Sequence, residues 1–167
     1  MVFFSAGKGG GELIDYGYKG KGVLTHLLAD GEGNPVAFAT TSAKGDERQQ
    51  VEGLLDSVNH LLANFCKETG LFPIFEADKG YDSTELREKL LKRKIYPLIP
   101  YRRMGKEEAW KKIASWVLRK RWQIERAIAW LQRKFRRLIA RWERKLKYWK
   151  GFLNFSLIVF WVDRISG

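Results

Sequence analysis

The chain has few cysteines and histidines, the residues that form disulfide bonds in secreted proteins and bind zinc. Its 167 residues include one cysteine, Cys66, and two histidines. A single thiol cannot form an internal disulfide, so a disulfide-bonded scaffold is excluded, and so is a cysteine-rich zinc module. Because this composition suits a reducing compartment, we expect the protein in the cytoplasm.

Leader segments and long apolar runs are also missing. The N-terminus shows no charged segment followed by an apolar stretch and a cleavage site, so no signal peptide is expected. The longest apolar run, residues 152–162, contains Asn154 and Ser156 and falls short of the roughly 20 residues that span a bilayer. We therefore predict no membrane segment and a buried helix over 152–162, which begins after a break at Gly151.

Acidic residues are scarce, and the imbalance is local. The chain holds 31 Lys and Arg against 19 Asp and Glu, a net charge of +12. Residues 1–86 carry −6, whereas residues 87–150 carry 23 basic and 5 acidic residues, or +18. The basic residues alternate with Trp, Ile and Leu, which argues against a disordered tail. Nucleic acid is the polyanionic partner that we expect.

Turn residues and β-rich runs organise the first half of the chain. Residues 1–22 contain too many glycines for a strand or helix interior, so a loop or wide hairpin is expected. Residues 23–29 and 36–41 should form a hairpin around the turn at 30–34. The pattern then predicts a helix that ends at Gly70 and a buried strand over 72–77.

Two further elements precede the basic half. Asp46 and Asp82 each stand where a helix cap is expected, with Gln49 and Glu85 three residues later. Residues 95–100 read as a strand, and Pro97 inside it places that strand at a sheet edge.

One long basic helix is expected over residues 113–147. Its apolar positions step by three, four or seven residues, which fits one helical face. They are Val117, Ile124, Ile128, Leu131, Phe135, Leu138 and Trp142. The other faces carry most of the arginines, which suits a surface that binds phosphates.

Two acidic residues could carry chemistry. Asp78 follows the strand predicted over 72–77, where open α/β sheets present ligands, but a helix-capping role is equally compatible. Glu125 is isolated among arginines on the long helix. It could form a solvated ion pair with Arg121, or it could hold a divalent cation beside DNA, since carboxylates bind hard cations while arginines bind the phosphodiester backbone.

Two separated blocks, FEADKGYDSTELREKLLKRKIYPLIP and RWQIERAIAWLQRKFRRLIARWER, resemble the DDE transposases of bacterial insertion sequences, in the group of insertion sequences four and five. The segment GYKGKGVLTHLLADGEGNPVAFATTSAKGDERQQVEGLLD is similar to that family's hairpin and first helix. The resemblance covers about residues 7–164. It implies an α/β, RNase H-like fold in one domain over 1–167, with a mixed sheet of order 3-2-1-4-5 flanked by helices.

The resemblance also implies a DNA transposase catalytic domain that cleaves and joins transposon ends. In such enzymes three carboxylates bind two Mg²⁺ (or Mn²⁺) ions for phosphoryl transfer. Asp78 matches the second carboxylate and Glu125 the third. The basic residues expected to contact DNA are Lys79, Arg121, Arg133 and Arg137. The implied partners are double-stranded DNA, as transposon ends and target, and a second copy of the chain at synapsis. The implied place is the bacterial cytoplasm, at the nucleoid when DNA is bound.

The sequence departs from the family pattern at two places. Leu118 stands where the family has Tyr, and Gln132 where it has Lys, with Arg133 adjacent. The family's first catalytic Asp lies on a strand just before a segment resembling VFFSAGKGGGE, and Met1 and Val2 occupy that end here. We therefore expect an N-terminally truncated domain whose central strand is largely missing, a weak metal site and an inactive chain.

Part of that strand could survive, and other acids could replace the missing ligand. We expect residues 1–5 to supply a remnant of the strand. Asp15, Asp30 and Asp46 are internal candidates for the ligand, but a Gly-rich loop, a hairpin turn and a helix cap explain them locally.

Two other functions stay open at this point. A non-catalytic DNA-binding remnant or regulator of transposition would keep the basic helix without the chemistry. A basic RNA-binding protein would share the charge and would be indifferent to the loss of Glu125.

Overall fold

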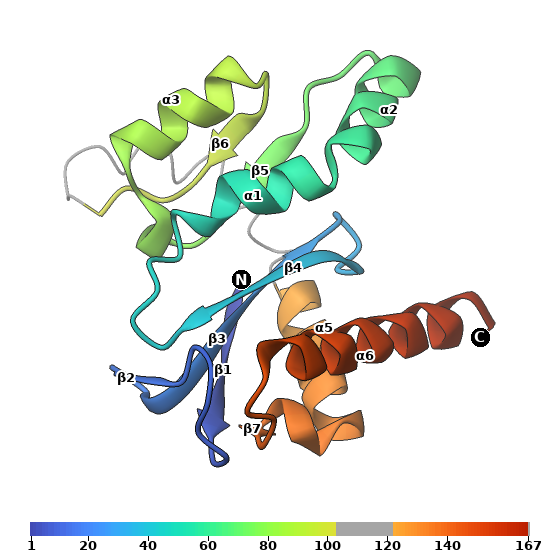
Figure 1. Cartoon of the computed structure of the whole chain (residues 1–167). Helices are drawn as coiled ribbons and strands as arrows, with labels where there is room; N and C mark the ends of the chain where they lie inside the picture. The colour runs from blue at the N-terminus through green and yellow to red at the C-terminus, as the bar shows by residue number, and fades with distance from the viewer. Residues whose placement is uncertain (103–121, 167) are drawn as a thin grey trace. The chain divides into compact units, whose positions relative to one another are not determined.

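The computed structural model describes residues 1–102 and 122–166, which are drawn as ribbon in Figure 1. The chain divides into two compact units, one made of Met1–Asp46 with Trp122–Gly167 and the other of Glu47–Arg121. The expectation of one domain over residues 1–167 stays a prediction.

A five-stranded mixed sheet organises the first unit (Figure 1). Its strands are β1 (Val2–Gly7), β2 (Asp15–Gly17), β3 (Gly20–Ala29), β4 (Pro35–Ser42) and β7 (Ala140–Arg141). The strand β3 is central to the antiparallel part, since it pairs with β2, β1 and β4. The strand β1 pairs on its other side with β7, in parallel.

The predicted hairpin is confirmed, with its turn at 30–34. The Asp30 carboxylate accepts hydrogen bonds from the backbone N–H groups of Glu32 and Asn34, both at 2.9 Å, and from the Asn34 side chain. A short polar side chain that bonds the backbone two and four residues ahead stabilises such a turn locally. This explains why the sequence alone located it.

The prediction that the first strand is largely missing is wrong for this structure. Residues 2–7 form a six-residue strand, and its register with β3 runs from Val2 opposite His26 to Ala6 opposite Gly22. The glycines of residues 1–22 fall mostly after Ala6, so they do not interrupt β1. The expected remnant over residues 1–5 is therefore present and paired.

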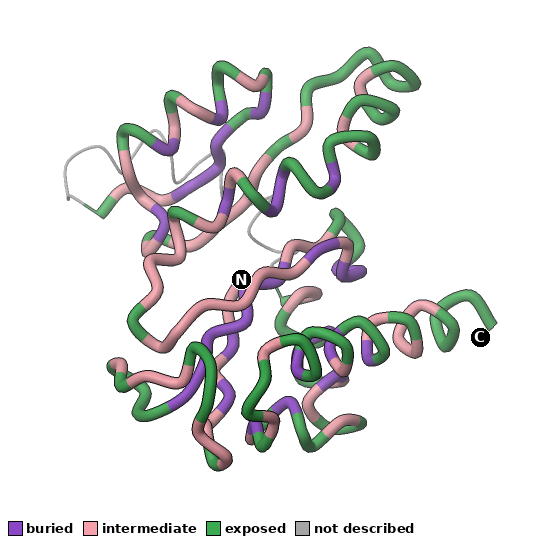
Figure 2. Tube along the Cα trace, in the orientation of Figure 1, coloured by how far each residue is buried: buried purple, intermediate pink, exposed green. Residues whose placement is uncertain are grey.

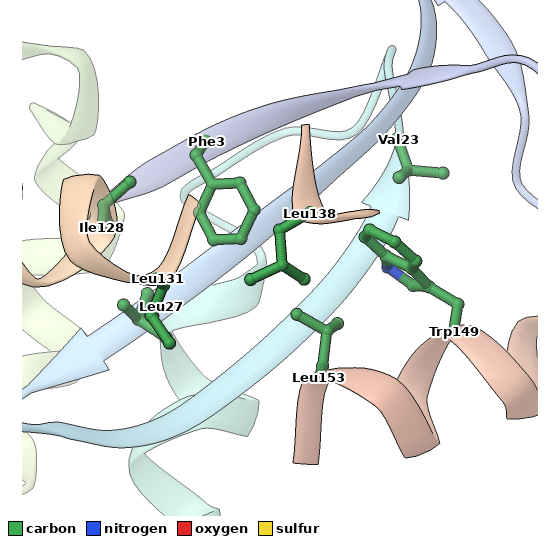
Figure 3. Packing of buried hydrophobic residues seen from close by; sticks show 8 residues of the cluster. All are labelled: Phe3, Val23, Leu27, Ile128, Leu131, Leu138, Trp149 and Leu153. Carbon is green, nitrogen blue, oxygen red and sulfur yellow. The ribbon is translucent and has the colours of Figure 1, made fainter. Parts of the chain in front are cut away.

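The core of the first unit lies between one face of this sheet and two helices, α5 (Trp122–Lys134) and α6 (Leu146–Ser166). Phe3, Val23 and Leu27 point from the strands toward this layer (Figure 3). The helices and the segment between them add Ile128, Leu131, Leu138, Trp149 and Leu153. Alternate residues of β3 therefore fill one face, and because six consecutive residues of the strand are buried (Figure 2), its other face is covered too.

The single helix predicted over 113–147 is wrong beyond Lys134. Residues 113–121 lie outside the described residues; α5 ends at Lys134 and is followed by a 3₁₀ turn, η3 (Arg136–Leu138), and by β7. The apolar spacing fits a helix, but β1 offers main-chain partners: the Ala6 N–H donates to the Ile139 carbonyl at 3.0 Å. Pairing with β1 therefore overrides the helical period.

The closing helix is longer than predicted, and the prediction that it is buried over 152–162 is wrong, since Phe155 and Ile158 are 53% and 62% exposed. It spans Leu146–Ser166 and continues through Gly151, where a side chain would meet open space. A glycine in a helix interior costs only about 1 kcal/mol, and packing of Trp149 and Leu153 in the core outweighs this. In the described ranges, no helix combines the length and the apolarity that crossing a membrane requires.

A buried arginine in β7 forms hydrogen bonds with the loop after β1 and with the segment that follows β7. The Arg141 side chain donates to the carbonyls of Glu12 and Glu143, both at 2.8 Å, and of Arg144 at 3.5 Å. The residue is 0% exposed, although the predicted helix placed it outward, whereas Trp142 is 63% exposed. Three carbonyl acceptors satisfy a charge that would otherwise be costly to bury.

In its described part, residues 47–102, the second unit contains a short parallel sheet and three α-helices. Its elements are α1 (Gln50–Ser57), α2 (Asn59–Thr69), β5 (Ile74–Glu76), η1 (Lys79–Tyr81), α3 (Thr84–Lys92) and β6 (Tyr96–Leu98). As predicted, α2 ends at Gly70, whose φ of 69° suits glycine. The strand predicted over 72–77 is shorter and only partly buried.

Both predicted caps are displaced. The helix α1 begins at Gln50 without a side-chain cap hydrogen bond at Gln49, so Asp46 does not cap it. Ser83 caps α3 by accepting from the Leu86 N–H at 3.4 Å. Asp82 instead accepts hydrogen bonds from the Arg87 side chain and the Arg102 N–H.

The expected sheet order 3-2-1-4-5 is met only in its first half. The order β4-β3-β1 corresponds to strands 3-2-1, but β7 occupies the other side of β1. The strand β5 pairs with β6 in a separate two-stranded sheet, in which Pro97 stands opposite Phe75. Both strands of that sheet are edges, so the placement of Pro97 in an edge strand is confirmed.

Replacing Arg141 with methionine should lower the free energy of unfolding by roughly 3 kcal/mol, because three buried carbonyls lose a charged donor. Urea denaturation would measure this. Arg144→Met, at an exposed position of the same segment, should change stability by about 0.5 kcal/mol or less. Equal effects of the two changes would show that the buried guanidinium is not what holds β7.

A second prediction concerns His26 in β3, which is 1% exposed and whose Nε2 lies 2.8 Å from Thr41 Oγ1. Burial lowers the pKa of His26 from 6.5 to about 4. The unfolded chain therefore binds the proton more readily, and stability should fall by roughly 3 kcal/mol as the pH drops from 6.5 toward 4. Above pH 6.5 this contribution is constant. Urea denaturation across that range should show a shallower decline for His26→Gln, and parallel curves would contradict the burial of a neutral ring.

Candidate active-site carboxylates and their surroundings

Asp78 lies in the second unit, two residues after the end of β5. It is the N-cap of η1, and its Oδ1 accepts a hydrogen bond from the Gly80 N–H at 2.7 Å. The residue is partly exposed, and Lys79 beside it is exposed. The sequence left a strand-end site and a capping role open, and the structure shows that Asp78 does cap a turn while it keeps the strand-end position.

Two arginines hold the turn that carries Asp78. Arg102 donates from its side chain to the carbonyls of Lys79 at 2.9 Å and Gly80 at 3.0 Å, and from its backbone N–H to Asp82 at 2.8 Å. Arg87 binds the same Asp82 carboxylate from Nη2 at 2.9 Å and the Ile99 carbonyl at 2.5 Å. The backbone that follows Asp78 is therefore held by polar contacts, in addition to the burial of Tyr81.

The charge state of Asp82 follows from these contacts. Partial burial raises the pKa of this carboxyl, but the Arg102 N–H and the Arg87 guanidinium together outweigh burial and lower the pKa. The carboxylate is thus held ionised between two cations. The sequence pattern assigned Asp82 to a helix cap, and nothing in the spacing pointed to Arg102, twenty residues further along the chain.

Glu125 lies in the first unit, in the first turn of α5, and is exposed. This part of the helix lies against the β3–β4 turn. Gly33 has a φ of 84°, and a Cβ there would lie 2.8 Å from the backbone carbon of Gln123. Only glycine permits this close approach of the turn to the helix, two residues before Glu125.

Cationic and aromatic side chains surround this end of α5. The Arg126 guanidinium lies 4.6 Å from the Trp122 ring centroid. Arg126 also lines an open pocket of about 290 Å³ in the first unit, together with Trp130 and Phe160. Arg164 lies 3.7 Å from Glu32 at the same pocket. The surface beside Glu125 is therefore basic but includes paired charges.

The predicted DNA-binding residues have different surroundings. Lys79 and Arg133 are exposed. Arg137 forms an ion pair with Glu143 and stacks over the Phe152 ring at 5.0 Å from its centroid. Arg121 lies outside the described residues. The role of these four residues in DNA binding stays a prediction.

The internal candidates for a first carboxylate have local partners. Asp15 accepts from the Tyr16 N–H at 2.8 Å and lies 3.1 Å from Lys44, and the Lys44 hydrogen bond lowers its pKa. Asp30 is engaged in the hairpin turn. The helix-cap explanation of Asp46 is wrong, because α1 begins at Gln50. Over residues 1–102 and 122–166, no cluster of three or more His, Cys, Asp or Glu side chains suited to a metal ion is found.

Comparison with known proteins decides the family. The model of the transposase DDE domain matches residues 5–153, most of the chain. The chain belongs to the DDE transposase family. It is also 32% identical over 129 residues to a Burkholderia cepacia protein described as a transposase for insertion sequence element IS402, which covers 77% of this chain. The chain spans 57% of that protein's length. No solved structure matches.

The family match confirms the resemblance drawn from the two sequence blocks, and both candidate carboxylates lie within the matched residues. The structure adds how each acid is positioned: a turn held by arginines carries Asp78, and a helix that lies against a hairpin turn carries Glu125. The two acids belong to different units.

The contacts around Asp78 give a third prediction. Asp82→Asn should lower the free energy of unfolding by about 2 kcal/mol, because the buried ends of Arg87 and the Arg102 N–H lose a charged acceptor. Urea denaturation followed by circular dichroism would report it. Glu88→Gln, on the exposed face of α3, is the matched control and should be close to neutral. Equal stability of the two variants would contradict the account of the turn.

Proposed function

We propose that this chain is the catalytic part of a DNA transposase, which cleaves transposon ends and joins them to target DNA by phosphoryl transfer that depends on Mg²⁺ or Mn²⁺. The match of the transposase DDE domain over residues 5–153 carries the proposal. Residues 87–150 hold 23 basic and 5 acidic residues. This positive charge supports a DNA substrate, because phosphate contacts supply much of the affinity for DNA.

Asp78 and Glu125 are the residues that would hold the divalent ions. Both offer carboxylate oxygens, which are the ligands that Mg²⁺ and Mn²⁺ prefer. The Gly80 N–H already orients Asp78 Oδ1. Asp78 is partly exposed and Glu125 is exposed, so an ion could reach each carboxylate. When bound, the ions would lower the pKa of an attacking water or hydroxyl and stabilise the charge on the leaving oxygen.

The chain's own basic residues would bind and orient the DNA. Lys79 follows Asp78 directly, and Arg126 and Arg133 are exposed on the helix that carries Glu125. Cationic side chains beside a carboxylate offset its repulsion of the phosphodiester, so the backbone can approach the acids. Arg126 stacks on Trp122, which holds the guanidinium in a defined position.

The fourth prediction tests both acids. Asp78→Asn and Glu125→Gln should each weaken Mn²⁺ binding in calorimetric titration at least severalfold, because each removes a charged oxygen ligand. The same variants should bind duplex DNA as tightly as the parent chain or more tightly, since a negative charge is removed from a DNA-binding surface.

Matched controls separate this effect from a general loss of acidity. Glu88→Gln in the second unit and Glu32→Gln in the first replace exposed carboxylates that the proposal does not use, and neither should change Mn²⁺ binding. Unchanged Mn²⁺ binding in both site variants would remove the metal role. If duplex affinity of the parent chain does not fall with rising salt, the DNA proposal fails as well.

A further inference from the structure

A short two-stranded ribbon projects from the first unit. The strand β2 pairs with the beginning of β3 through Asp15 opposite Gly22, Tyr16 opposite Lys21 and Gly17 opposite Gly20. Tyr18 and Lys19 form the two-residue tip between Gly17 and Gly20. Among the described residues, Gly20 and Lys21 of β3 pair with β2 alone, and the pairing of β3 with β1 begins at Gly22. We call residues 15–22 the tip ribbon.

The tip ribbon exposes two aromatic rings and two lysines. Tyr18 is 103% exposed and Tyr16 is 66% exposed, and Lys19 and Lys21 are exposed too. Tyr16 and Lys21 stand opposite each other, so they share a face, and the Lys21 Nζ lies 5.6 Å from the Tyr16 ring centroid. Single exposed aromatics are common on proteins. Two of them with two lysines on one projecting ribbon form a defined surface.

The positive charges of Lys19 and Lys21 are not neutralised by an acidic side chain of the tip ribbon. Asp15 is the one acidic residue in 15–22, and it pairs with Lys44 at 3.1 Å. The Lys44 hydrogen bond and the Tyr16 N–H also stabilise its ionised form and lower its pKa. Lys19 and Lys21 are therefore available to an anionic partner.

The ribbon is also held in place. A Cβ at Gly17 would lie 2.0 Å from the Ala43 carbonyl oxygen, so β2 approaches the end of β4 as closely as the backbone allows. Gly20 has a φ of 108°, which closes the tight turn. A preformed ribbon loses little conformational entropy on binding, which favours affinity.

We propose that the tip ribbon enters a groove of duplex DNA, with Lys19 and Lys21 on phosphates and Tyr18 against the groove floor. The major groove admits a two-stranded β-ribbon, and projecting strands are a known way for proteins to contact either groove. The positive charge selects a polyanion over an apolar protein surface. This inference rests on the proposed function, since it assigns a contact to the same DNA substrate.

The contact lies away from the end of the sheet that is near Glu125. The strand β3 runs from the ribbon tip at Gly20 to Ala29, next to the turn that lies against α5 at Gln123, and ten residues of strand span about 30 Å. That distance corresponds to roughly nine base pairs of B-DNA. The ribbon should therefore contribute to DNA affinity without affecting metal binding at Glu125.

The fifth prediction concerns binding of the full chain to a duplex oligonucleotide several turns long, measured by fluorescence anisotropy as salt is varied. Tyr18→Ala should weaken binding about tenfold without changing the salt slope, because an uncharged contact is lost. The pair Lys19→Ala and Lys21→Ala should reduce the magnitude of the slope of log affinity against log salt by about 0.9 for each lysine. Neither change should alter Mn²⁺ binding.

Tyr148→Ala and Lys67→Ala are the matched controls. Tyr148 is 58% exposed on α6, and Lys67 is exposed on α2; neither change should match the loss seen at the ribbon. Tip variants that bind duplex DNA like the parent chain would overturn this inference and leave the proposed function standing. A loss confined to single-stranded DNA would overturn the groove contact in favour of base stacking. A parent chain without affinity for duplex DNA would overturn both proposals.

Discussion

The buried guanidinium of Arg141 joins two segments that are far apart in the sequence, the loop after β1 and residues 141–144. It bonds the Glu12 carbonyl in the Gly-rich loop after β1 and the carbonyls of Glu143 and Arg144 before α6. Its own backbone carbonyl accepts from the N–H groups of Lys8 and Gly9. This cluster keeps β7 beside β1, and the Leu146 N–H at the start of α6 bonds the Glu12 carboxylate at 2.9 Å. Because α5, β7 and α6 are consecutive, the core above the sheet depends on it.

The two candidate carboxylates are positioned by unlike means. Asp78 depends on polar contacts, since a hydrogen-bonded turn and two arginines hold the backbone that follows it. Glu125 depends on packing, because α5 buries Ala127, Ile128 and Leu131 and meets the hairpin turn at Gly33. The surroundings of Asp78 should therefore respond to acid through the Asp82 contacts, and those of Glu125 to core substitutions in α5. Each acid is left on a partly or fully exposed surface, where DNA and ions can reach it.

Features that are set by residues close together in the sequence were predicted correctly. The turn at 30–34 follows from the hydrogen bonds of Asp30, the end of α2 from a left-handed Gly70, and the edge position of Pro97 from its missing N–H. The cap of α3 was missed because Asp82 and Ser83 are adjacent polar residues, and Asp82 accepts from Arg87 and from the distant Arg102 N–H. Asp78 and Glu125 were found through the two sequence blocks that resemble transposases; spacing alone left both open.

The sequence by itself determined the family, the two acids within its motifs, the concentration of positive charge in 87–150 and the turns. These features depend on residue identity and local geometry, which a chain carries wherever it folds. Tertiary structure alone decided that residues 140–141 form a strand and that Arg141 is buried while Trp142 is exposed. The helical spacing of Phe135, Leu138 and Trp142 was compatible with one long helix. The unpaired main chain of β1 offered hydrogen bonds that no local pattern encodes, and satisfying them changed the fold of that segment.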